Sequence, residues 1–157
     1  MLHGNSIIIF YNFKKNILST LKFITKINAP KEKVWNTLWN DSTYRQWTAA
    51  FMEGSYAESD WKEGSKILFL TPKGDGMFSI IEKKVPNEQM TFKHLGEIKN
   101  GVEEPKNWEG AKESYHLEEK NGITELDVEL DSVGEFEQYF NDTFPKALNR
   151  LKEISEE

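Results

Sequence analysis

The sequence contains no cysteine among its 157 residues. Disulfide bonds, thiolate metal ligands and a cysteine nucleophile are therefore excluded. A chain without thiols fits a reducing compartment, and we expect a cytoplasmic protein. The length suits one domain, which at this size buries roughly 70% of the surface that its unfolded chain exposes. One hydrophobic core can stabilise such a domain.

Positive charge is scarce as well. Lys and Arg total 20 against 26 Asp and Glu, which gives a formal net charge of −6. Nucleic-acid binding depends on clustered Lys and Arg. The densest basic segments, Lys31–Lys33 and Lys83–Lys84, are short and isolated, so we expect no nucleic-acid partner.

Long hydrophobic runs are absent from the N-terminal region. The apolar patch Ile7–Tyr11 is far shorter than the roughly 20 residues of a membrane-spanning helix. No basic segment precedes it and no small-residue cleavage site follows it, which argues against a signal peptide. We expect residues 1–20 to be an extension, disordered or outside the expressed protein, and residues 21–157 to form the domain. We expect no membrane span, and an anchor formed by the patch is the weaker alternative.

The first part of the domain predicts one strand and two short helices. Residues 21–27 alternate as a strand does, and Asn28-Ala29-Pro30 ends the strand, with Asn28 or Ala29 as a helix cap and Pro30 in the first turn. Asp41-Ser42 offers a second cap. Apolar residues after each cap recur at helical spacing: Val34, Trp35, Leu38 and Trp39, then Tyr44 and Trp47.

After residue 64 the apolar spacing changes to two, which predicts β-strands. The strand segments are 65–70, 76–85, 89–98, 112–120 and 123–131. Asn121-Gly122 between the last two is the strongest hairpin signal, and strands joined by tight turns form an antiparallel meander. The connection over residues 99–113 is long and polar, which is typical of a lid or binding loop.

The C-terminal segment has the pattern of an amphipathic helix. Its apolar residues recur at intervals of three and four: Phe136, Phe140, Phe144, Leu148 and Leu151. Pro145 interrupts this pattern, because an interior proline costs about 3 kcal/mol or bends the helix. We expect a kink near Asn141 or a new helix capped by Asp142 or Thr143. Since only this helix is long enough to cover an apolar sheet face, the sequence predicts an α+β fold in which a curved antiparallel sheet of about six or seven strands wraps the helix.

Several stretches together carry a resemblance to a known family. They are "INAPKEKVWNTLWN", "YRQW", "DWKEGSKILFL", "GMFSIIEKKVPNEQMTFKHLG" and "FPKALNRLKEI". Over roughly residues 20 to 155 the chain resembles the START-like, or Bet v 1-like (SRPBCC), helix-grip superfamily. Within it, the chain is most similar to bacterial homologues of the C-terminal domain of the activator of heat-shock-protein-90 ATPase. The resemblance implies a cavity between sheet and helix, but no invariant catalytic residues.

Strand parity selects the titratable residues that face such a cavity. Lys93 marks the outer face of its strand, so Phe92 and His94 point inward. His94 is a candidate general base, because its unperturbed pKa lies near neutrality, and Tyr115 is a second candidate for catalysis. No carboxylate or serine is visibly paired with His94, which favours a hydrogen-bonded core histidine. His116 has the opposite parity and His3 lies in the extension, so we expect no metal site and no cofactor.

Aromatic residues dominate the remaining candidates. A tryptophan buries about 150–250 Å², which at about 25 cal/mol per Å² is reason enough for Trp35 or Trp39 to be in the core. By the resemblance, however, the aromatic segments border one cavity, and Trp108 is expected at its mouth. Our candidate ligand-binding residues are Trp39, Trp47, Phe51, Phe69, Met77, Phe92, His94, Trp108, Tyr115, Tyr139, Phe140 and Phe144.

Three functions follow as alternatives. The leading hypothesis is the binding of a lipid-like or aromatic small molecule, with Tyr115, His94 and Ser79 as its polar contacts. The second is a cyclase- or hydrolase-like enzyme that uses His94 and Tyr115 as acid and base. The third is a protein-interaction domain that aids a chaperone, as the family name suggests. Homodimer formation is left open.

Overall fold

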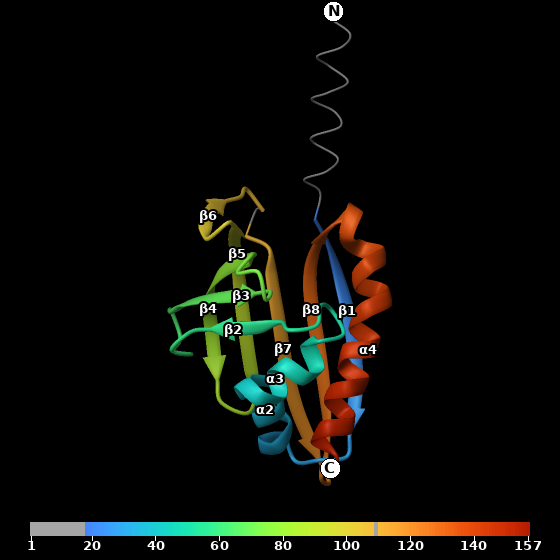
Figure 1. Ribbon diagram of the computed structural model, residues 1–157. Helices are drawn as coiled ribbons and strands as arrows, with labels where there is room; N and C mark the ends of the chain where they lie inside the picture. The colour runs from blue at the N-terminus through green and yellow to red at the C-terminus, as the bar shows by residue number, and fades with distance from the viewer. Residues whose placement is uncertain (1–17, 109) are drawn as a thin grey trace, which may run out of the picture.

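An antiparallel sheet forms the body of the protein (Figure 1). The computed structural model describes residues 18–108 and 110–157. Within them the strands are β1 (Leu18–Ile27), β2 (Tyr56–Glu58), β3 (Lys66–Leu70), β4 (Gly76–Val85), β5 (Gln89–Lys99), β6 (Val102–Pro105), β7 (Lys112–Lys120) and β8 (Ile123–Val133). The strand order is β1-β8-β7-β5-β4-β3-β2, and β6 pairs with β5.

Helices cover one face of this sheet. They are α2 (Lys31–Trp39), α3 (Asp41–Thr48) and α4 (Glu137–Ser155), the last preceded by a 3₁₀ turn, η1 (Gly134–Phe136). In Figure 1, α4 lies along β1 and β8, and α2 and α3 lie toward the end of the sheet where the C-terminus is found. α4 packs on β1, α2 and α3. The predicted α+β architecture, with two short helices after the first strand and a long C-terminal helix on the sheet, is confirmed.

The inward residues of the strands form the core. Phe92 and Tyr115 are almost fully buried, as strand parity predicts, and so are Leu126 and Val128 on β8. The alternating acids Glu125, Asp127 and Glu129 lie on the opposite face of β8, at half-buried or exposed positions. Strand parity therefore identifies the core face of β5, β7 and β8 correctly.

Two short strands were not predicted. β2 has only three residues, and β6 has the sequence Val-Glu-Glu-Pro, which carries no apolar alternation. β6 lies within the segment 99–113 that was expected to be a loop. Strand β1 also begins at Leu18 rather than at residue 21. The rest of the expected extension, residues 1–17, lies outside the described residues.

A β-bulge changes the parity of β5. Ser79 pairs with His94 but Phe78 pairs with Gly96, so Leu95 is an extra residue on β5. Simple alternation along β5 predicts Gly96 on the same inward face as Phe92 and His94. The expectation is wrong, because a Cβ on Gly96 would lie 2.7 Å from the ring of Phe78, which belongs to a second apolar cluster with Leu70 and Ile98.

Helix ends differ in detail from the predictions. The caps are Pro30 for α2 and Asn40 for α3, and neither makes a side-chain capping bond. α4 continues through Pro145, so no new helix begins at Asp142 or Thr143. Pro145 deprives the carbonyl of Asn141 of its usual amide donor. Both residues are exposed, so water can replace that donor.

The packing of α4 on the sheet predicts which of its substitutions lower the stability of the protein. Leu151 is fully buried against the sheet, and we expect Leu151→Ala to lower the free energy of unfolding by about 2–5 kcal/mol, because it leaves a cavity in the core. Urea unfolding followed by circular dichroism measures this. Lys146→Ala, on the exposed face of the same helix, should change stability by less than about 0.5 kcal/mol. Equal effects of the two substitutions would contradict the packing described.

Candidate functional site

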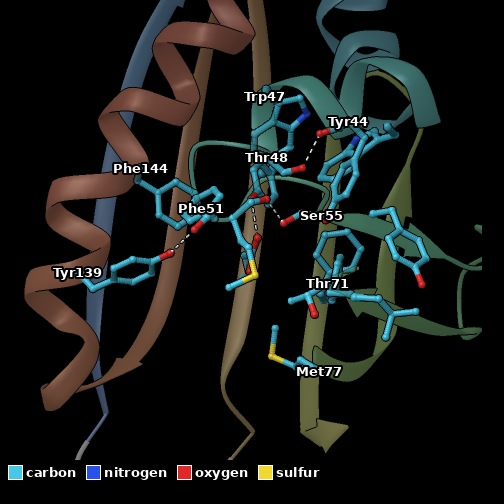
Figure 2. Close-up of a pocket in the computed structure, with 17 residues that line it drawn as sticks. Tyr44, Trp47, Thr48, Phe51, Ser55, Thr71, Met77, Tyr139 and Phe144 are labelled. Atoms are coloured by element: carbon cyan, nitrogen blue, oxygen red, sulfur yellow. Dashed lines mark hydrogen bonds between the residues drawn. The ribbon is translucent and has the colours of Figure 1, made fainter. Parts of the chain in front are cut away.

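A cavity lined mainly by aromatic rings lies between the sheet, α3 and α4 (Figure 2). We name it the aromatic cavity, and its volume is about 250 Å³. The rings that line it are Trp39, Tyr44, Trp47, Phe51, Tyr56, Phe69, Phe92, Tyr115, Tyr139 and Phe144. Glu113 is its one charged lining residue in the described part of the chain. The cavity is therefore an apolar space with a single ionisable acid in its wall.

A larger cavity adjoins the first one. It has a volume of about 510 Å³ and lies between β4, β5, β7, β8 and the start of α4. We name it the acidic cavity, because its described lining includes acids but neither lysine nor arginine: Glu97, Glu113, Asp131 and Glu135. Met77, Glu113 and Tyr139 line both cavities. The two cavities are neighbours that share these three lining residues, and we call the pair the hollow region under α4.

Polar side chains form a continuous hydrogen-bonded chain in the wall of this region. Ser79 Oγ lies 2.7 Å from His94 Nδ1, and His94 Nε2 lies 3.2 Å from Glu113 Oε1. The hydroxyl of Tyr115 donates to Glu113 Oε2. The expectation that His94 has no serine or carboxylate partner is therefore wrong. It failed because these side chains come from three strands, β4, β5 and β7, whose register the sequence does not reveal.

A placement of the protons exists in which each of these four side chains has a hydrogen-bond partner. The Ser79 hydroxyl donates to Nδ1 of His94, and the Nε2–H donates to Glu113. Each carboxylate oxygen of Glu113 then accepts one hydrogen bond. Because a carboxylate has about four acceptor positions, Glu113 keeps acceptor capacity toward the cavities.

The arrangement differs from that of a hydrolytic triad. Ser79 is fully buried and lines neither cavity, so its hydroxyl does not face a substrate. His94 lines the acidic cavity, but only 6% of its surface is exposed and both of its nitrogens are bonded. A nucleophile needs an accessible oxygen beside its base. These hydrogen bonds therefore fix the position of Glu113 and do not activate Ser79 as a nucleophile.

The pKa values of two buried tyrosines reflect the electrostatics of the aromatic cavity. Burial, followed by the negative charge of Glu113, raises the pKa of Tyr44 above its usual 10.0. The same two causes, in the same order, raise the pKa of Tyr115. Both phenols therefore stay protonated well beyond the range of a free tyrosine.

Tyr139 connects α4 to the segment that follows α3. Its hydroxyl donates to the carbonyl of Phe51 over 3.0 Å, a contact visible in Figure 2 as a bridge from the helix toward that segment. Tyr139 is 45% exposed, and Met52 and Phe136 are also exposed although they line the cavities. These apolar side chains form the rim of the hollow region.

All of the candidate ligand-binding residues named from the sequence line one cavity or the other. Trp39, Trp47, Phe51, Phe69, Phe92, Tyr115 and Phe144 line the aromatic cavity, His94, Trp108 and Phe140 line the acidic cavity, and Met77 and Tyr139 line both. Trp35 is buried but lines neither. The ring of Trp39 has neighbours on several sides, with the ring centroid of Tyr115 at 5.0 Å and that of Phe92 at 5.4 Å.

Glu113 is the residue that sequence reasoning missed. It has the same strand parity as Tyr115 and Leu117 on β7, so an acid at an inward-facing position was a readable signal.

Among the described residues, no group of three or more His, Asp or Glu side chains could hold a metal ion. None of the described helices is long and apolar enough to cross a membrane.

The fold and the hollow region under α4 define a helix-grip domain of the Bet v 1-like type. Residues 28–156 match the family described as "Activator of Hsp90 ATPase homolog 1-like protein", and the chain belongs to this family. The resemblance noted from the sequence is thereby confirmed. A search of curated protein sequences found no match.

Solved structures share the fold at low sequence identity. The Aha1 dimer from Colwellia psychrerythraea has a TM-score of 0.69 at 23% identity, over 88% of this chain and 96% of that chain. Protein CV1439 from Chromobacterium violaceum has a TM-score of 0.66 at 16% identity, over 88% and 97%. CalU16 from Micromonospora echinospora has a TM-score of 0.62 at 18% identity, over 88% and 76%.

The raised tyrosine pKa values predict an alkaline loss of stability. Below pH 10 both tyrosines are protonated in the folded and the unfolded state, so their contribution is constant. Above pH 10 the unfolded state releases protons that the folded state retains, so the free energy of unfolding falls with pH. We expect Tyr44→Phe to make this fall shallower. Urea unfolding between pH 8 and pH 11 tests the effect, and identical slopes for wild type and variant would contradict it.

Proposed function

We propose that this protein binds an apolar small molecule in the hollow region formed by the aromatic and acidic cavities. The observation that carries the proposal is the cavity pair itself, which remains beneath α4 beside a closely packed core. Together the cavities fall within the roughly 300–1,000 Å³ of typical ligand sites. Mostly apolar walls with a few fixed polar groups are also typical of such sites.

The rim supports the same conclusion. Met52, Phe136 and Tyr139 are large, exposed and apolar or aromatic, and they lie where the cavities open. Exposed apolar side chains that gather at one place mark interaction sites more often than scattered ones do. A ligand that moves from water into the cavities would cover these side chains. The apolar surface that is buried in this way adds to the favourable free energy of binding.

An enzyme that uses His94 and Tyr115 as acid and base is the alternative. Both residues are hydrogen-bonded to Glu113, and His94 is bonded to Ser79 as well. Proton transfer to a substrate would require at least one of these bonds to break. Binding requires none of them to break, so the geometry favours binding.

The quaternary structure is a separate proposal. The homologue from Colwellia psychrerythraea was solved as a dimer, and we propose a homodimer for this chain on that likeness alone. Light scattering on the full chain tests it. A chaperone partner, suggested by the family description, is tested by pull-down with a purified chaperone of that class.

The binding proposal predicts a bound compound. Native mass spectrometry of gently purified protein should show the mass of the chain plus an apolar small molecule that denaturation releases. An environment-sensitive dye should bind the emptied protein at one site, because apolar probes prefer the apolar cavity to water.

Filling the hollow region tests its location. Met77 lies between the two cavities, so Met77→Trp should weaken dye binding by about tenfold or more, since the added ring occupies the space that the dye needs. Val102→Trp is the matched control, because Val102 is exposed on β6 and lines neither cavity. Unchanged dye binding by Met77→Trp, with the fold intact, would place the site elsewhere.

A further inference from the structure

Glu113 is the charged residue that lines both cavities. Its side chain is 17% exposed, and it lies where the aromatic and acidic cavities adjoin. The contacts of its carboxylate come from His94 and Tyr115. In the described part of the chain, no lysine or arginine forms an ion pair with it. A carboxylate withdrawn from water is destabilised unless donors or a cation compensate its charge.

The other acids of the acidic cavity are in a different position. Glu97 lies 3.2 Å from Lys99 Nζ and 4.0 Å from Lys106 Nζ, so its charge is compensated at the surface. Asp131 accepts hydrogen bonds from the Thr20 hydroxyl and the Lys112 amide. Glu135 lies at an exposed position, where water screens its charge. Glu113 therefore stands apart as the partly buried acid that lines both cavities.

We propose that the ligand is an amphiphile with a single cationic amine, whose ammonium group binds Glu113 where the two cavities meet. The apolar part of the ligand lies among the rings of the aromatic cavity. This inference rests on the proposed function, and it names the chemical class of the ligand and the residue that selects it.

Three observations support the sign of the charge. Glu113 lines both cavities, and its hydrogen-bond partners are His94 and Tyr115 rather than a lysine or arginine of the described residues. Burial is the main cause of the raised pKa of Tyr44 and Tyr115, and the negative charge of Glu113 raises both further; only this second contribution would favour an ammonium. Trp39, Tyr44 and Trp47 supply aromatic walls, which attract cations through their ring quadrupoles. A carboxylate ligand would meet like charge at Glu113, and an alcohol would gain only a neutral donor.

The test compares head groups on one tail. Decylammonium, decanol and decanoate are titrated calorimetrically into the emptied full-length protein near neutral pH, below the concentrations at which they form micelles. We expect decylammonium to bind about tenfold more tightly than decanol, because a hydrogen bond to a charged group is stronger than a neutral one. Decanoate should bind least tightly.

A matched pair of variants assigns the preference to its residue. Glu113→Gln keeps the shape of the side chain and removes its charge, so the advantage of decylammonium over decanol should disappear and decanoate should bind more tightly. Glu118→Gln makes the same change on the same strand at a residue that lines neither cavity, and the wild-type order should remain. If Glu113→Gln does not fold, the order of affinities of the three compounds for the wild-type protein tests the amine proposal.

The outcomes separate the inference from the proposed function. Decanol binding as tightly as decylammonium, or decanoate binding most tightly, overturns the amine proposal and leaves apolar binding in place. Failure of all three compounds to bind removes the proposed function and the inference together. Retention of the amine preference by a folded Glu113→Gln protein overturns the assignment to Glu113.

Discussion

The seating of α4 on the sheet is the constraint on which the rest of the structure depends. From Thr143 to Leu151 the inward side chains of the helix are buried, and Phe144 stacks on Phe23 with ring centroids 4.9 Å apart. The first turns, around Tyr139 and Phe140, are only partly covered. The helix is thus fixed at its C-terminal half and stands over open space at its N-terminal half. The two cavities lie at this uncovered end.

Rigid aromatic packing keeps that space open. Trp39 meets both Tyr115 and Phe92 edge to face, and Phe69 meets Phe92 in the same way at 5.1 Å. Edge-to-face contacts between rings are favourable beyond the area that they bury. The same side chains therefore serve two purposes, since one side of each ring belongs to the core and another borders the cavity. Stability and the proposed binding therefore depend on the same residues.

Local patterns in the sequence were sufficient for most of the fold. The alternation of Leu126, Val128 and Leu130 and the spacing of Phe144, Leu148 and Leu151 depend on covalent periodicity, so they are readable without the structure. The contact between His94 and Glu113 depends on how β5 aligns with β7, and the contact between Ser79 and His94 depends on how β4 aligns with β5. Neither leaves a mark in residue order. Strand parity and the family resemblance together named residues that line the cavities, but they did not name Glu113.

The bond between Tyr139 and the carbonyl of Phe51 has a kinetic consequence. It is a neutral hydrogen bond at a solvent-exposed position, so its net strength is about 1 kcal/mol. Tyr139 lines both cavities, so under the proposed function a guest that spans them lies against this ring. Under the proposed function, the rate at which such a guest is released therefore depends on how readily this weak bond opens.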